Sequence, residues 1–178
     1  MKWAATEAEY DMTILNCTLK LATRIPFPIA YEDSAATNTL GPWSGNTFHL
    51  GRIPFIILTN ERTLLSVVIS LKDVHTFWMR FLASLETVLH QLQIQTVTVK
   101  EELQSMREVT FMRATNRRTL GSMNDLVHMV RAIVAQEPNT TLEAVNLELS
   151  GVVSLALQGL YPKDAVHQAF NTLPPQRK

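Results

Sequence analysis

The sequence predicts an α+β fold, in which a small antiparallel or mixed sheet of about four to five strands is packed by one long helix and several shorter helices. Three observations predict this class. Strand-like segments gather in residues 12–70, whereas helical patterns fill residues 74–170 around a single further strand. The connections between the early strands are short enough for antiparallel pairing. A long amphipathic segment then supplies an apolar face to cover the sheet.

The chain begins with a predicted strand over residues 12–17, where strand-favouring apolar and polar residues alternate. Thr18 is expected to cap a short helical turn over residues 19–24, which Pro26 ends. Residues 29–43 are rich in turn-forming types and predict a long surface loop.

Three strands of a meander are predicted next. They cover residues 46–50, 55–58 and 63–70, joined by turns at residues 51–52 and 59–62. The second of these strands is apolar without alternation, which indicates a strand covered on both faces. A later strand is predicted over residues 108–113, and pairing beside this meander would bring the turn that follows it to the sheet end that holds the Trp43 loop.

Helices dominate the rest of the chain. Asp73 is expected to cap the longest helix, over residues 74–93, where apolar side chains recur at positions i, i+3, i+4 and i+7. The other helices are predicted over residues 98–106, 122–135, 140–149 and 163–170. Two of them begin at predicted capping boxes, at Thr98 and at Thr140.

Length and composition predict one globular domain over residues 12–173, with residues 1–11 as an N-terminal extension. A chain of 178 residues suits a single domain. Apolar residues make up 46% of it and charged residues 18%, which favours a globular protein over a disordered one. The extension lacks the apolar core of a signal peptide, and no apolar run approaches the ~20 residues that span a bilayer. We therefore expect no membrane partner.

Charge and cysteine content argue against several function classes. The chain has 16 Lys+Arg and 16 Asp+Glu, so a general nucleic-acid binder is not expected, although a local basic patch remains compatible with this balance. Cys17 is the only cysteine, which rules out a disulfide within one chain and favours the cytoplasm. The five histidines lack metal-ligand spacing, and nucleotide-binding and nucleophile motifs are absent. We expect no cofactor and no metal, and leave a homodimer open.

Four blocks of residues form a recognisable series. They are Asn16-Cys17-Thr18-Leu19-Lys20-Leu21; Leu40, Gly41, Trp43 and Asn46; Leu58-Thr59-Asn60; and Thr115 to Asp125, which contains Leu120-Gly121-Ser122-Met123-Asn124-Asp125. In order and composition they resemble a family of small bacterial proteins known only as a domain of unknown function. The resemblance covers residues 12–170. It implies a single domain and no particular activity, and it directs attention to the Trp43 loop and the turn over residues 117–125.

The turn that precedes the predicted helix at Ser122 admits two interpretations. Ser122 and Asp125 have the spacing of a helix cap, which explains both residues without a ligand. Alternatively, the positive end of the helix binds an anion together with Arg117 and Arg118. Asp125 partly neutralises that end, so the cap is the favoured interpretation. Asn124 is required neither by the cap nor by the core.

The candidate site joins this turn to the Trp43 loop. Trp43 either stacks on a planar ligand or covers the edge of the sheet, and covering is the commoner role. Asn46 and Asn60 either line the same pocket or bond to turn backbone. The predicted binding residues are Trp43, Asn46, Asn60, Arg117, Arg118, Ser122, Asn124 and Asp125.

Two functions remain open. The first is a non-enzymatic binding or regulatory module for a small ligand or a partner protein, which the balanced charge and the missing catalytic motifs favour. The second is a small enzyme that acts on an anionic or polar substrate, with His49 as the acid-base residue and Arg117 or Arg118 as the anion clamp. Convergence of the candidate polar residues with His49 on one concave pocket favours the enzyme.

Overall fold

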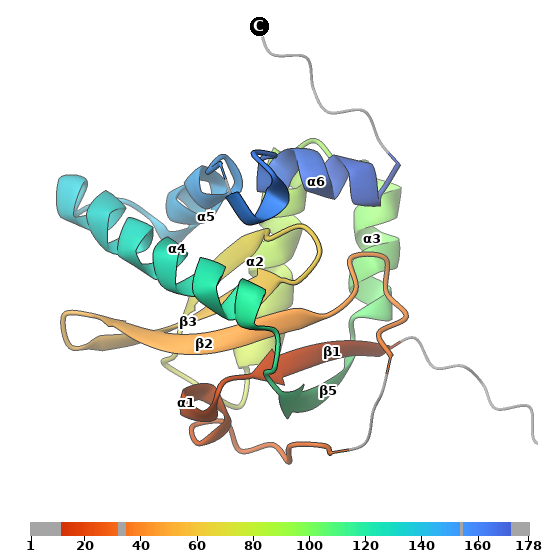
Figure 1. The fold of residues 1–178 in the computed structure, drawn as a ribbon, viewed down its shortest axis with the longest axis horizontal. Helices are drawn as coiled ribbons and strands as arrows, with labels where there is room; N and C mark the ends of the chain where they lie inside the picture. The colour runs from red at the N-terminus through yellow and green to blue at the C-terminus, as the bar shows by residue number, and fades with distance from the viewer. Residues whose placement is uncertain (1–11, 32–34, 154, 172–178) are drawn as a thin grey trace, which may run out of the picture.

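The computed structural model describes residues 12–31, 35–153 and 155–171 (Figure 1). Five strands form one mixed sheet in the order β4-β3-β2-β1-β5. Apolar side chains on its two faces belong to two separate cores, one beneath α2 and the other beneath α4 and α5. The predicted α+β class is confirmed. Residues 1–11, the predicted extension, lie outside the described residues.

The predicted meander is present, with longer strands at its centre than the sequence indicated. It consists of β2 (Trp43–Leu50), β3 (Ile53–Asn60) and β4 (Ser66–Ser70), and both pairings are antiparallel. Trp43 opens β2 instead of ending a loop, because its backbone pairs with Asn60 across the hairpin. The expected surface loop is therefore shorter than predicted.

The first strand joins the meander to the last one. β1 (Met12–Cys17) runs parallel to β2, and β5 (Glu108–Arg113) runs parallel to β1 along its whole length. The strand at residues 108–113 is present but does not pair beside the meander, because β1 lies between them. Parallel neighbours far apart in sequence are not specified by local pattern, which explains the difference.

Only the beginning of β2 has a strand on both sides. Trp43, Ser44 and Gly45 pair with β1 as well as with β3. The chain then leaves β1 at Thr18, which caps α1 (Leu19–Ala22) by accepting a hydrogen bond from the Leu21 N–H at 3.3 Å. In the described part of the chain, residues 46–50 of β2 are paired with β3 alone. This half of β2 presents an open edge towards α1.

The outer edges of the sheet are covered. On β4, the Asn146 side chain accepts from the Val68 N–H at 2.7 Å and donates to the Val68 carbonyl at 3.2 Å, as a neighbouring strand would. On β5, the Ala30 N–H donates to the Phe111 carbonyl at 2.7 Å. Contacts of this kind occupy part of each edge and hinder pairing with other chains there.

One core lies between the sheet and α2 (Phe77–Gln91), with α3 (Thr96–Ser105) and α6 (Pro162–Ala169) beside it. The predicted apolar stripe of α2 is confirmed as buried: Phe77, Phe81, Leu85, Val88 and Leu92.

The start of α2 is three residues later than predicted. The Asp73 carboxylate accepts hydrogen bonds from the Thr76 hydroxyl at 2.8 Å and the His75 N–H at 3.0 Å, forming a turn ahead of the helix. The Thr76 hydrogen bond, followed by that of His75, lowers the pKa of Asp73. Asp73 is therefore not the cap residue itself.

The second core lies under α4 (Arg117–Gln136) and α5 (Leu142–Ser150), on the opposite face of the sheet (Figure 1). It joins Met123, Leu126, Val130 and Ile133 of α4 to Phe48, Ile57 and Val68 of the sheet. A short 3-10 turn, Leu155–Leu157, follows α5.

Three predicted caps are displaced. Thr141, not Thr140, caps α5 by accepting from the Ala144 N–H at 3.1 Å. Thr98 lies inside α3, because that helix already begins at Thr96 without a side-chain cap. Ser122 lies inside α4, which begins five residues earlier than predicted. For Thr98 and Ser122, the S/T-x-x-E/D spacing occurs inside a helix, and at Thr140 it misses the cap by one residue.

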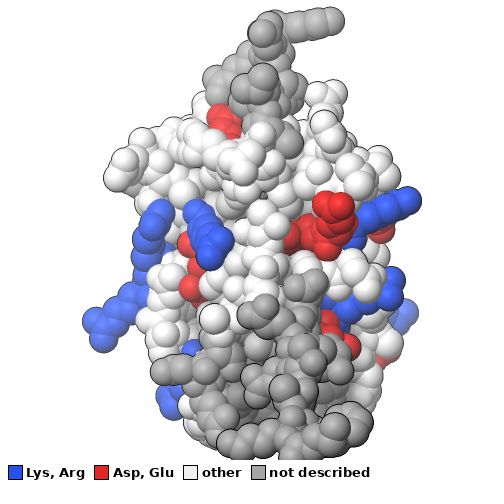
Figure 2. Space-filling model, turned by 90° about the vertical axis from the view of Figure 1, so that its right-hand side faces the viewer, with Lys and Arg blue, Asp and Glu red and all other residues white. Residues whose placement is uncertain are grey.

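Surface charge on the face drawn in Figure 2 is mixed. Acidic and basic side chains of the described residues lie beside one another there, with uncharged surface between the groups. This pattern agrees with the balanced composition of the chain. Among the described residues, this face therefore carries no extended patch of a single charge.

Candidate functional site

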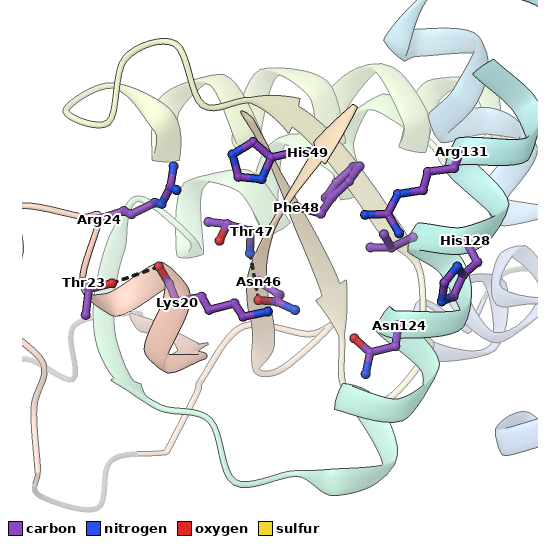
Figure 3. A pocket seen from close by; sticks show the side chains of 11 residues that line it. Lys20, Thr23, Arg24, Asn46, Thr47, Phe48, His49, Asn124, His128 and Arg131 are labelled. Atoms are coloured by element: carbon purple, nitrogen blue, oxygen red, sulfur yellow. Dashed lines mark hydrogen bonds between the residues drawn. The ribbon is translucent and has the colours of Figure 1, made fainter. Parts of the chain in front are cut away.

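A cleft of about 690 Å³ opens between α1, β2 and α4, along the open edge of β2 (Figure 3). Three parts of the chain line it. Lys20, Thr23 and Arg24 come from α1 and the turn after it, residues 46–49 from β2, and Asn124, Val127, His128 and Arg131 from α4.

Apart from His49 on β2, the Lys, Arg and His side chains of this cleft lie on two opposite walls. Lys20 and Arg24 lie on the α1 side, whereas His128 and Arg131 lie on the α4 side, with β2 between them (Figure 3). None of the 11 lining residues is acidic. Among the residues that the structure describes, Lys20, Arg24 and Arg131 form no ion pair. The cleft is therefore a local concentration of positive charge in a neutral chain.

Asn46 supplies a hydrogen-bond donor between the two walls. Its Oδ1 atom accepts from the Thr18 hydroxyl at 2.8 Å and from the Thr47 N–H at 2.9 Å. Because the Thr47 N–H can only donate, the amide atom that it contacts must be the oxygen of Asn46. The other amide atom is therefore the nitrogen. The Nδ2 group of Asn46 is thus left to face the cleft (Figure 3).

The open edge of β2 adds a backbone donor. The Gly45 carbonyl accepts from the Thr18 N–H at 3.0 Å, so the backbone groups of Gly45 point away from β3. Every second residue of a strand points the same way, which places those of Thr47 and His49 on this edge. Asn46 already satisfies the Thr47 N–H. The His49 N–H therefore remains as a donor at the cleft.

The α4 wall consists of one polar face of the helix. Asn124, His128 and Arg131 recur at positions i, i+4 and i+7 and are all exposed, whereas Met123 and Val130 are buried in the core below. The packing of α4 on the sheet thus fixes the direction in which these three side chains project.

Glu61 connects two strands of the sheet to the start of α4. Its carboxylate accepts from the Asn16 amide at 2.8 Å, the Ser44 hydroxyl at 2.6 Å and the Asn116 amide at 3.0 Å. Asn116 in turn caps α4, because its Oδ1 accepts from the Thr119 N–H at 3.2 Å. One carboxylate therefore connects β1, β2 and the start of α4.

The predicted site residues do not form one site. Asn46 and Asn124 line the cleft together, and His49 lies there too. Trp43 is fully buried on the other face of the sheet, where its ring meets that of Phe81 edge-to-face at 4.9 Å. Trp43 therefore packs in the core and does not line the cleft.

Asn60 is a structural residue. It is fully buried, its Nδ2 donates to the Leu40 carbonyl at 2.9 Å, and its Oδ1 accepts from the Thr63 N–H at 2.9 Å. These hydrogen bonds hold the turn between β3 and β4 against the preceding loop. Asn60 does not line the cleft that holds Asn46 and Asn124.

The remaining four residues line a different pocket. Arg117, Arg118, Ser122 and Asp125 surround a space of about 500 Å³ with several apolar side chains, among them Leu64, Leu126, Met129, Val152 and Pro162. Ser122 does not stand at a helix end, because α4 begins at Arg117 and Ser122 lies inside it. The predicted clamp residues therefore do not share a pocket with His49.

The basic residues of the two walls were not predicted. Lys20, Arg24, His128 and Arg131 each look like ordinary surface positions in the sequence. Their spacing could nevertheless have indicated two polar faces. Lys20 and Arg24 are four residues apart, and Arg131 shares a helical face with Asn124. Only the fold, however, places the residues of the α1 wall and those of the α4 wall around one cleft.

Other kinds of site find no support in the described ranges. No group of three or more His, Cys, Asp or Glu there is arranged to hold a metal ion. No helix within those ranges combines the length and apolar character that crossing a membrane requires. Cys17 is buried, and this burial raises the pKa of its thiol from 9.0 to about 12.

Comparison with known proteins gives a family without an activity. No curated protein matches the chain. A family model described as a domain of unknown function, DUF6933, matches residues 14–165, which is most of the chain. The resemblance to a domain of unknown function that the four sequence blocks indicated is confirmed. The chain therefore belongs to the DUF6933 family.

Proposed function

We propose that this domain is a binding module for a small anionic ligand, and that the cleft between α1, β2 and α4 is its binding site. One observation carries the proposal. Lys20, Arg24 and Arg131 converge on a cleft without an acidic lining residue, although the chain as a whole has no net charge. Unpaired cations facing one concave space attract anions by Coulomb forces and by charge-assisted hydrogen bonds.

The size of the cleft supports a small molecule. Its volume of about 690 Å³ lies within the range of ~300–1,000 Å³ that is usual for small-molecule sites. An extended nucleic acid usually requires a broad basic surface, which a chain with 16 basic and 16 acidic residues is poorly suited to supply. The Asn46 and Asn124 amides add polar contacts that fix the orientation of a ligand.

The surroundings of His49 favour binding over catalysis. A catalytic imidazole is usually held by a carboxylate or carbonyl that sets its tautomer. The His49 side chain is exposed, and no described residue forms a hydrogen bond with it. Arg24 and Arg131, in place of Arg117 and Arg118, flank the same space as His49. The imidazole serves here as a further contact for the anion.

Thermal unfolding in sodium phosphate and in sodium chloride of equal ionic strength tests the proposal. A ligand that binds the folded state raises its stability, so phosphate is expected to raise Tm of the wild type. The double variant Arg24→Gln/Arg131→Gln should lose this increase. The matched double variant Arg52→Gln/Arg107→Gln removes two exposed arginines outside the cleft and should keep it. An equal phosphate effect in all three proteins, or none in any, contradicts the proposal.

A further inference from the structure

We infer that the ligand of the cleft carries two or more linked phosphate groups, one held at each wall. The inference rests on the proposed function and names the ligand class of the same site. The positions of the charged side chains support this inference, because the cations lie on two walls and do not surround one point. Lys20 and Arg24 face Arg131 across β2 (Figure 3).

A single phosphate ion uses only part of such a site. In a cleft of about 690 Å³, an ion bound against Arg24 leaves the opposite wall with an uncompensated cation. A ligand with linked phosphates contacts both walls at once. The second contact then forms within an existing complex, which raises affinity without any new residue.

The balance of charge favours phosphates over a pair of carboxylates. Three permanently charged side chains line the cleft, and no acidic side chain lines it to offset them. Linked phosphates carry more negative charge than a dicarboxylate of equal length. The guanidinium groups of Arg24 and Arg131 also match phosphate oxygens with two parallel hydrogen bonds each.

The floor between the walls fits the bridge of such a ligand. The Asn46 Nδ2 group and the His49 N–H both donate, and the only acceptor atom of the Asn46 side chain is already occupied. Phosphate oxygens at neutral pH mainly accept hydrogen bonds. A phosphate chain that runs along the edge of β2 therefore finds donors along its length.

Isothermal titration with inorganic phosphate, pyrophosphate and tripolyphosphate, each without added metal, tests the inference. Affinity should increase along this series, and tripolyphosphate should bind at least about tenfold more tightly than phosphate. Equal affinities across the series would overturn the inference, while the proposed anion site would stand. Absence of binding by all three anions would overturn both.

Single-wall variants separate the two contacts. Arg24→Gln and Arg131→Gln should each remove most of the gain with chain length, yet change the affinity for inorganic phosphate little, because the other wall remains. Arg52→Gln, on the turn after β2 and outside the cleft, should keep the full gain. A similar loss in Arg52→Gln would indicate general surface attraction and contradict the inference. A Tm measurement on each variant verifies that it is folded.

Discussion

The Thr18 hydroxyl donates to the Oδ1 atom of Asn46 at 2.8 Å. The same hydroxyl oxygen accepts from the Leu21 N–H at 3.3 Å and so caps α1. One side chain therefore starts the helix that carries Lys20 and also orients the amide that faces the cleft. The Thr18 side chain therefore links the stability of α1 to the geometry of the candidate site.

Replacement of Thr18 should affect stability and binding together. Thr18→Val keeps the shape of the side chain but removes the hydroxyl, so the helix cap is lost at a cost of ~1 kcal/mol. Asn46 loses the partner that holds its amide, and the affinity for tripolyphosphate should fall several-fold. Thr18→Ser retains the hydroxyl and should stay close to wild type in both respects. Chemical denaturation and titration calorimetry provide the two readouts, and equal affinities for Thr18→Val and wild type would contradict the coupling.

The start of α4 gives a second matched pair. Asn116→Ala removes the cap of the helix and one partner of Glu61, so the free energy of unfolding should fall by ~1–2 kcal/mol. Ser122→Ala should change it by less than ~0.5 kcal/mol, because Ser122 lies inside the helix. Urea denaturation measures both values. The reverse order of the two effects would restore Ser122 as the cap.

The stripe on α2 provides the main test of the core. Phe81 is fully buried between Trp43 and Trp78, so Phe81→Ala should cost ~3–5 kcal/mol. Met79 lies on the same helix with 64% of its surface exposed, and Met79→Ala should change stability by less than ~0.5 kcal/mol. Equilibrium denaturation compares the two variants. A loss below about 1 kcal/mol for Phe81→Ala would mean that this face is not the core.

The buried thiol of Cys17 predicts a pH-dependent stability. Because burial raises its pKa from 9.0 to about 12, the folded state keeps the proton that the unfolded state loses. This contribution is fully present below pH 9.0 and is lost as the pH rises towards about 12. Cys17→Ala should therefore show a smaller fall in stability over that range than wild type does.

The same burial protects Cys17 from modification. Ellman's reagent at pH 8 should react with Cys17 only after unfolding, because the folded thiol is neither exposed nor ionised. Rapid reaction in native conditions would place Cys17 at the surface and contradict the packing of β1. Reaction of the denatured protein serves as the control.

The sequence predicted most of the fold because strand and helix periodicities are local. Local residue spacing predicts the strand over residues 12–17, the hairpins and the stripe of α2. Tertiary contacts in the folded protein favour the same structures. Trp43 was placed in a loop because Gly41 and Pro42 precede it, whereas its pairing with Asn60 depends on a partner across the hairpin. The errors thus concentrate where a distant residue decides the local structure.

The start of α4 shows most clearly why a distant residue can defeat a prediction from local sequence. Ser122 and Asp125 satisfied the local rule for a cap, but Asn116 is the cap that Glu61 holds in place from 55 residues away. The candidate site shows the same limitation. Asn46 and Asn124 were predicted, and the arginines that give their cleft its charge were not, because no local pattern shows that Arg24 and Arg131 line opposite walls of one cleft.

Backbone amide NMR shifts during a titration with tripolyphosphate test the central claim most directly. The perturbed amides should cluster in residues 19–24, 46–49 and 124–131, which surround the cleft. Arg24→Gln/Arg131→Gln should abolish these changes. Perturbations centred on residues 117–122 would place the anion at the Arg117 pocket instead. That result, or unchanged amides along β2, would contradict the assignment of the cleft as the binding site.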